Sequence, residues 1–290
     1  MSKVVTIKND NLSIDIENLG AQMKSIKGSN GTEYLWQGDE NVWAGRAPVL
    51  FPICGGLKDD KYIFEGKEYI LNKHGYARFK EFTLEKSDEN SAVFLHKSDE
   101  ETKKSYPFDY EFRIIYTLDG NKITVTYETK NVSDKTTMYF SVGAHEGYSC
   151  PEGIEEYEIV FDKPETLDSY VLDGNLLEEN TVRVMENSTV FPLKCEYFSV
   201  DALVFRNLNS RKVQLRNKNG DRKIDVEFNG SDYLLFWTKP NNIGKYICIE
   251  PWCGIQDGVD SDYDFVNKEG IISLEPFGTH SVSHTITIEV

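Results

Sequence analysis

Residues 108–129 read FDYEFRIIYTLDGNKITVTYET and carry the clearest structural signal in the chain. On either side of Asp119-Gly120-Asn121, aromatic and β-branched residues alternate with polar ones. Alternation with a period of two is typical of a strand with one buried face. Because a short turn of Asp, Gly and Asn separates the two runs, this stretch predicts a β-hairpin.

The same alternation recurs along the chain, at residues 23–27, 62–71, 212–216, 223–228 and 284–290. Turn residues follow two of these runs, at Asn219-Gly220-Asp221 and at Asn229-Gly230. No long stretch keeps apolar residues at helical spacing, and no Pro- or Ser-rich linker interrupts the sequence. We therefore predict an all-β fold, a large antiparallel β-sandwich or barrel, forming a single domain over residues 1–290.

The charge balance argues against two classes of partner. The 290 residues contain 32 Lys and Arg against 48 Asp and Glu, a formal net charge of −16. Such a surface repels phosphodiester backbones and anionic lipids, so we expect neither a nucleic acid nor a membrane partner. A neutral small molecule is unaffected by this field.

Cysteine spacing and the N-terminus favour a cytoplasmic protein. The five cysteines form no C-x-x-C pair, which argues against a zinc ribbon or a disulfide framework. The first residues lack the apolar core of a signal peptide, and no run approaches 18 apolar residues. The motifs GxxxxGK, GxGxxG, HExxH and GxSxG are absent, so we expect neither a cofactor nor a metal.

Four motifs place catalytic residue types beside apolar runs. They are GRAPVLFP with Arg46, HGYAR with His74 and Arg78, SVGAHEGY with His145, and CIEPW with Glu250 and Trp252. A carboxylate at the end of an apolar run is costly unless it is paired or functional. Taken singly, each motif also fits a structural explanation, such as an edge strand, a surface loop, a solvated strand end or a tryptophan packed in the core.

Together with VDALVF around Asp201 and FWT around Trp237, these motifs resemble the aldose 1-epimerase (galactose mutarotase-like) family. The similarity is greatest to its LacX-type branch, with the hexose-6-phosphate mutarotases as near relatives. It runs from about residue 10 to the C-terminus, and six motifs occur in the right order. The resemblance implies a β-supersandwich with a sugar site on its concave face.

The resemblance also implies roles for individual residues. His145 matches the general acid of the family, Glu250 its general base, and His74 a histidine that contacts the sugar ring. Asp201 matches a carboxylate that binds sugar hydroxyls. The remaining candidate substrate-binding residues are Arg46, Arg78, Trp237 and Trp252. Arginines grip the phosphate in the sugar-phosphate branch, so this branch stays open.

The chemistry of anomer interconversion suits these residue types. A base takes the C1 hydroxyl proton while an acid protonates the ring oxygen, the C1–C2 bond rotates, and the ring closes on the other face. A Glu with a pKa of about 4.3 and a His with a pKa of about 6.5 can supply both groups near neutral pH. We therefore predict an isomerase that acts on a small carbohydrate, an aldohexose or its phosphate. The alternatives are a hexose-6-phosphate mutarotase and a carbohydrate-binding protein without turnover, and the oligomeric state is not predicted.

Overall fold

The computed structural model describes residues 3–220, 222–240 and 244–289 and confirms the all-β prediction. In these ranges the only helical elements are short 3-10 turns, and no helix is long and apolar enough to cross a membrane. The turns are η1 (Lys58–Asp60), η2 (Ala77–Phe79), η3 (Thr102–Lys104), η4 (Ile154–Glu156) and η5 (Cys195–Phe198).

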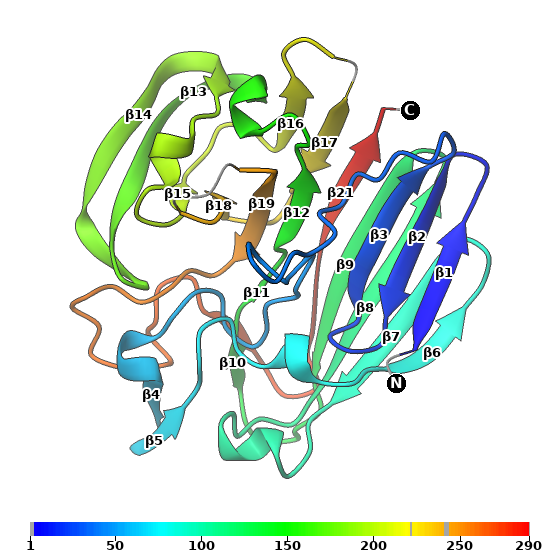
Figure 1. Ribbon diagram of the computed structural model, residues 1–290. Coiled ribbons are helices and arrows are strands. Elements are labelled where there is room, and N and C mark those ends of the chain that lie inside the picture. The colour runs from blue at the N-terminus through cyan, green and yellow to red at the C-terminus, as the bar shows by residue number, and fades with distance from the viewer. Residues whose placement is uncertain (1–2, 221, 241–243, 290) are drawn as a thin grey trace.

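A nine-stranded antiparallel sheet forms the largest layer, in the order β14-β13-β16-β17-β21-β9-β8-β7-β6 (Figure 1). Its strands are β6 (Thr83–Ser87), β7 (Ser91–Lys97), β8 (Tyr110–Asp119), β9 (Lys122–Asn131), β13 (Tyr157–Asp173), β14 (Leu176–Pro192), β16 (Lys212–Asn217), β17 (Lys223–Glu227) and β21 (Thr279–Ile288). The predicted hairpin is confirmed as β8 and β9, where Asp119 pairs with Lys122 and Gly120 adopts a φ of 55°.

Two smaller sheets pack on this layer. A five-stranded sheet contains β11 (Val142–Gly143), β15 (Leu203–Arg206), β18 (Tyr233–Trp237) and β19 (Tyr246–Cys253), with β12 (Glu146–Ser149) beside β19. A three-stranded sheet contains β1 (Val4–Lys8), β2 (Leu12–Glu17) and β3 (Gln22–Gly28). Two-stranded pairs are formed by β4 (Lys61–Phe64) with β5 (Lys67–Ile70), and by β10 (Met138–Phe140) with β20 (Ile272–Leu274).

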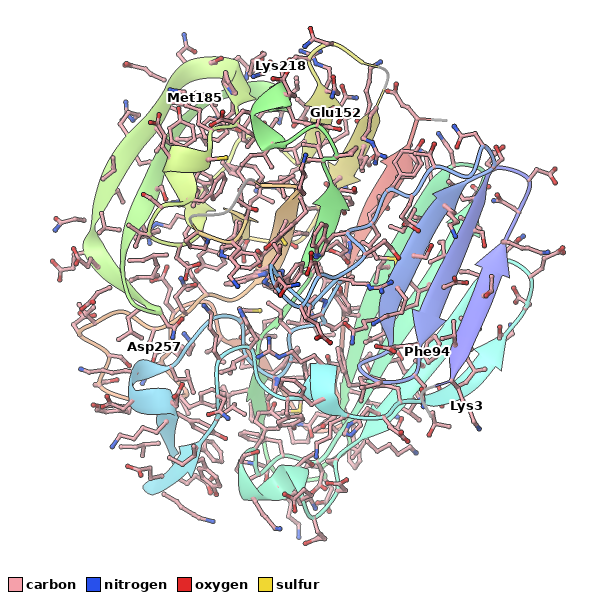
Figure 2. The ribbon with its side chains drawn as sticks, in the orientation of Figure 1. Lys3, Phe94, Glu152, Met185, Lys218 and Asp257 are labelled. Atoms are coloured by element: carbon pink, nitrogen blue, oxygen red, sulfur yellow. The ribbon has the colours of Figure 1, made fainter. Side chains whose placement is uncertain are left out.

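Side-chain contacts between the sheets make up the core of the sandwich. Nε2 of His284 on β21 lies 3.1 Å from Oε1 of Glu146 on β12, and both side chains are buried. On the other side, the Tyr116 hydroxyl of β8 donates a hydrogen bond to the carbonyl oxygen of Ala21. Phe94 of β7 is fully buried, whereas Lys3 and Lys218 are exposed at the periphery (Figure 2).

The structure corrects one strand prediction. The alternating run at residues 62–71 is not one strand but the hairpin β4–β5. Glu65 and Gly66 both have positive φ, 50° and 75°, and they reverse the chain. Gly66, in the middle of the run, therefore marks a turn, although the alternation of polar and apolar residues on either side of it suggested one continuous strand.

The long hairpin β13–β14 was not predicted. Each of its strands has 17 residues, and their register shifts at several points. Irregular pairing disrupts strict alternation, so the period-two signal is weak in this segment. The last predicted strand is β21, which ends at Ile288; Val290, the end of the predicted run, and Asp221 of the predicted turn both lie outside the described residues.

His96 of β7 makes stability sensitive to acid. Its side chain is buried, with Nδ1 3.0 Å from the Tyr110 hydroxyl, and burial lowers the pKa of His96 to about 4. In the unfolded chain the pKa of a histidine is about 6.5. Between these values the unfolded chain binds a proton that the folded protein does not, so the free energy of unfolding falls as the pH falls through this window.

We predict that His96→Gln weakens this pH dependence. Urea unfolding of both proteins at pH 7 and at pH 4.5 measures the effect. From pH 7 to pH 4.5, the free energy of unfolding should fall by about 2 kcal/mol more in the wild type than in the variant. Taking the difference between pH values cancels any pH-independent cost of the substitution. An equal loss in both proteins contradicts the prediction.

Candidate active site

The pairing of β19 with β11 and β12 places two predicted catalytic residues opposite each other. The register is the same on both sides of the gap between β11 and β12, which puts His145 directly opposite Glu250. Regular pairing is interrupted next to them because Pro251 has no N–H to donate. Both side chains point to the same face of the sheet, since directly opposed residues share a face.

The two side chains form a buried acid–base pair. His145 Nε2 lies 3.4 Å from Glu250 Oε2, and the side chains are 10% and 2% exposed. This separation is slightly longer than an ordinary hydrogen bond, and such contacts often tighten when a substrate binds. The geometry suits proton transfer to and from a ligand that contacts both groups.

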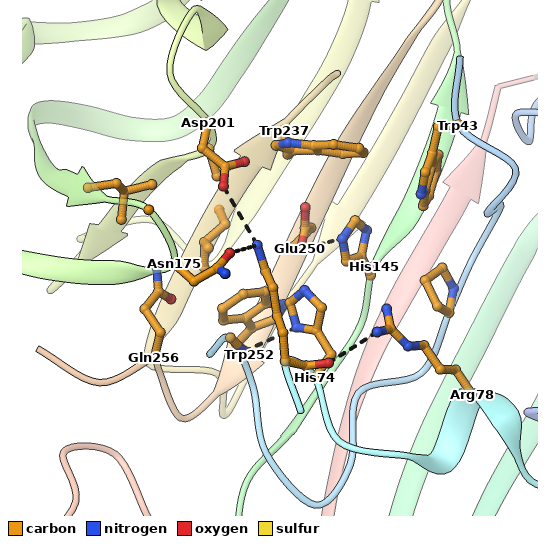
Figure 3. Close-up of a pocket in the computed structure, with 17 residues that line it drawn as sticks. Trp43, His74, Arg78, His145, Asn175, Asp201, Trp237, Glu250, Trp252 and Gln256 are labelled. Carbon is orange, nitrogen blue, oxygen red and sulfur yellow. Dashed lines mark hydrogen bonds and ion pairs between the residues drawn. The ribbon is translucent and has the colours of Figure 1, made fainter. Parts of the chain in front are cut away.

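The pair lies in a cavity of about 230 Å³ (Figure 3). The cavity is lined by Trp43, Pro48, Gly55, Lys73, His74, Arg78, His145, Leu172, Gly174, Asn175, Asp201, Ala202, Leu235, Trp237, Glu250, Trp252 and Gln256. Aromatic faces and polar groups converge in it, which is typical of a small-molecule site. Two cationic side chains, Lys73 and Arg78, and two carboxyl side chains, Asp201 and Glu250, line it.

An aromatic cluster holds His145 in place. The Trp43 ring stacks on the His145 ring at 5.4 Å, and the Trp237 ring meets it edge-on at 5.7 Å. A Cβ on Gly147 would lie 2.8 Å from the Trp43 ring, so tryptophan occupies the space beside this glycine.

His74 lies in a constrained turn beside His145. Its φ is 67°, an unusual conformation for a residue with a side chain, and such strain is often found at functional sites. The Gly55 N–H donates a hydrogen bond to His74 Nδ1 at 3.1 Å, which leaves the ring proton of the neutral imidazole on Nε2. Gly75 is required next to it, because a Cβ there would lie 2.4 Å from the carbonyl oxygen of Phe51.

Lys73 contacts two other lining residues, Asn175 and Asp201, which are labelled in Figure 3. Its ammonium donates a hydrogen bond to Asn175 Oδ1 at 2.7 Å and lies 3.6 Å from Asp201 Oδ2. Asn175 comes from the turn between β13 and β14, and Asp201 comes from the segment before β15. Three segments distant in sequence thus meet at one ammonium group.

Burial dominates the electrostatics of the His145–Glu250 pair. It raises the pKa of Glu250 well above its usual value, and the positive charge of Lys73 opposes this rise. Burial also lowers the pKa of His145 to about 3 and holds the pKa of His74 well below its usual value. Burial therefore favours the neutral form of each of these groups.

The two predicted arginines differ in position. Arg78 lines the cavity, where Nη2 donates a hydrogen bond to the carbonyl oxygen of Lys73 and Nε is buried without a hydrogen-bond partner. Arg46 is not among the lining residues; its guanidinium donates hydrogen bonds to the carbonyl oxygen of Lys24 and to Gln37 Oε1. The structure therefore brings Arg78, but not Arg46, to the catalytic pair.

The two predicted tryptophans both line the cavity. Trp252 is 2% exposed, and its Nε1–H donates a hydrogen bond to the carbonyl oxygen of Ala144 at 3.0 Å. Trp237 packs edge-on against Trp43 at 5.3 Å. Trp252 combines the roles of core residue and cavity wall that the sequence left as alternatives, whereas Trp237 is half-buried and lies only in the cavity wall.

Sequence reasoning missed four polar or aromatic residues of the lining: Trp43, Lys73, Asn175 and Gln256. Two of them adjoin predicted motifs, since Lys73 directly precedes HGYAR and Gln256 belongs to the segment CGIQD, which directly follows CIEPW. Asn175 follows Asp173-Gly174, which signals a turn and no chemistry. Trp43 is three residues before Arg46, but the His145 ring that it contacts is distant in sequence, so only the fold identifies it.

Comparison with known proteins agrees with this geometry. Residues 3–276 match the model of the family described as aldose 1-epimerase. The plasmid-encoded protein LacX of Lactococcus lactis subsp. lactis is 33% identical over 296 residues, covering 98% of this chain and 99% of that protein. Its chromosomal counterpart has the same identity and coverage.

Solved structures show the same fold. A galactose mutarotase related enzyme from Lactobacillus acidophilus superposes with a TM-score of 0.94 at 33% identity, covering 99% of this chain and 98% of that one. A galactose mutarotase-like protein from Lactobacillus casei also has a TM-score of 0.94, at 22% identity, with 99% and 100% coverage. The family match and the full-length similarity lead to one conclusion: this chain is a member of the aldose 1-epimerase family.

Proposed function

We propose that the protein is an aldose 1-epimerase that interconverts the α and β anomers of a hexose by acid–base ring opening. The observation that carries this proposal is the buried contact of 3.4 Å between His145 Nε2 and Glu250 Oε2. In the proposed mechanism the two groups share one proton, so that one can donate while the other accepts, as ring opening requires.

Glu250 is the proposed base and His145 the proposed acid. Glu250 takes the proton of the C1 hydroxyl, and His145 gives a proton to the ring oxygen as the C1–O bond breaks. Burial raises the pKa of Glu250 and lowers that of His145, so the proton favours Glu250 and must first pass to His145. Lys73 acts on both groups, because its positive charge favours the carboxylate form of Glu250 and disfavours the protonated form of His145. After rotation about C1–C2, the ring closes with both transfers reversed.

The surrounding residues are proposed to bind the sugar. His74 Nε2–H is available as a donor, since the other ring nitrogen already accepts from Gly55. Asp201 and Asn175 offer acceptors at the opposite wall, and Trp252 offers an apolar face for the C–H side of a pyranose ring. The five cysteines are free thiols, which supports a cytoplasmic location.

The substrate is proposed to be a free hexose. The protein carries a net charge of −16, which disfavours an anionic ligand. One observation favours the hexose 6-phosphate alternative: Arg78 lines the cavity with a buried Nε that has no hydrogen-bond partner. Arginine is well suited to bind phosphate.

Polarimetry on freshly dissolved sugars decides between these substrates. We expect the protein to accelerate mutarotation of α-D-glucose or α-D-galactose, with a higher kcat/KM than for glucose 6-phosphate. Acceleration of the phosphate alone assigns the protein to the hexose-phosphate branch. Binding without acceleration of any of the three sugars contradicts the enzyme proposal and indicates a carbohydrate-binding protein.

Glu250→Gln removes the proposed base while keeping the shape of the side chain. We expect kcat to fall by about 10²–10⁴-fold with KM little changed, because the amide cannot accept the C1 hydroxyl proton. Glu186→Gln, at an exposed position on β14, is the matched control and should retain the wild-type rate. A near-normal kcat in the Glu250 variant excludes this residue as the base.

His145→Asn removes the proposed acid. We expect a loss of about 10²–10⁴-fold in kcat, because the ring oxygen then leaves without a proton donor. The thermal unfolding midpoint and sugar binding, followed by ligand-observed NMR, check that the fold and the cavity persist. A variant that loses affinity but keeps kcat identifies His145 as a binding residue instead.

A further inference from the structure

Cys248 lies beside the catalytic pair, and the proposed reaction does not use it. It precedes Glu250 by two residues on β19 and therefore points to the same face of the sheet. The thiol is fully buried. The donor atoms of His145, Cys248 and Glu250 all lie within 4.8 Å of one another, so a small ion can contact all three after modest side-chain rotation.

These three donors suit a zinc-like cation. An imidazole nitrogen, a thiolate sulfur and a carboxylate oxygen are the ligand types of Zn²⁺, at distances of about 2.0–2.3 Å. His145 and Glu250 are already 3.4 Å apart, which is close to the spacing of neighbouring ligands in a tetrahedral site. Both also line the cavity, which provides an entry path and room for water as the fourth ligand.

Charge balance favours occupation of this buried position. A carboxylate and a thiolate together carry two negative charges, which a divalent cation neutralises while the imidazole stays neutral. Any proton that Glu250 or Cys248 carries is released to solvent when the ion binds, with no change in oxidation state. Other charged groups of the cavity act in both directions, since Lys73 and Arg78 oppose a cation and Asp201 attracts one.

We propose that His145, Cys248 and Glu250 form a binding site for a thiophilic divalent cation, and that the bound ion inhibits the enzyme. Inhibition follows because the ion engages the two groups that would exchange protons with the sugar. The binding site stands on the geometry alone, whereas inhibition also rests on the proposed epimerase function. The sequence analysis predicts no metal, because these ligands come from two separate segments without a metal-binding spacing.

Cobalt is the direct probe of binding. Titration of the wild type with Co²⁺ should give a thiolate-to-cobalt charge-transfer band in the near ultraviolet that saturates at one ion per chain and disappears when Zn²⁺ is added. Cys248→Ala and Cys248→Ser should abolish the band and weaken Zn²⁺ binding by at least about tenfold, as measured calorimetrically. Two substitutions are used so that a folding defect in one does not decide the outcome.

Cys195→Ala is the matched control. Cys195 is a partly exposed thiol near η5, does not line the cavity, and should leave the cobalt spectrum unchanged. A wild-type spectrum without a thiolate band overturns the proposal. So does a band that persists in both Cys248 variants or disappears in the Cys195 variant.

Activity measurements separate this proposal from the proposed function. Zn²⁺ should inhibit mutarotation by the wild type, and EDTA should restore the activity. For each Cys248 variant, inhibition is measured relative to the metal-free rate of that variant. The inhibition constant for Zn²⁺ should be at least tenfold higher in these variants than in the wild type. If the wild type has no epimerase activity, the proposed function fails while the cobalt spectrum still tests the site. If Zn²⁺ inhibits the wild type and the Cys248 variants equally, the assigned ligands are wrong.

Discussion

The antiparallel pairing of β19 with β11 and β12 is the constraint on which the site depends. β19 is buried along its whole length, and its neighbours fix it from both edges. The β11–β19 and β12–β19 pairings share one register, and this register places His145 opposite Glu250. A slip by one residue would turn these side chains to the opposite face of the sheet, toward the core.

Burial changes the acid–base properties of His145 and Glu250, and it also makes a charge on either side chain unfavourable. An isolated charge in this environment is unfavourable, and the surrounding residues lessen that cost. Lys73 supplies a positive charge, and its position is fixed by Asn175 and Asp201. The neutral imidazole of His74 adds a donor without adding a charge. The cavity thus combines low solvent access with fixed donors and acceptors, which suits proton exchange with a bound ligand.

The sequence predicted the fold through local patterns and the site through motifs. Alternation around Asp119-Gly120 identified the β8–β9 hairpin, because regular pairing on a half-buried sheet leaves a period of two. His145, Glu250, His74 and Arg78 were named from short motifs, and the structure brings them into one cavity. Arg46 was named in the same way, yet its guanidinium is engaged by Lys24 and Gln37, which no local pattern reveals.

What the sequence could not predict is long-range contact. The Lys73–Asn175 hydrogen bond joins residues 102 positions apart. This hydrogen bond can form because a backbone contact holds the turn of the β13–β14 hairpin against the loop that follows β19. In that contact the Leu177 N–H donates a hydrogen bond to the carbonyl oxygen of Asp257. Glu250 and the turn that carries Asn175 are therefore anchored to the same segment of chain. The far wall of the cavity is held at a fixed distance from the catalytic carboxylate, although the hairpin that forms this wall belongs to another sheet.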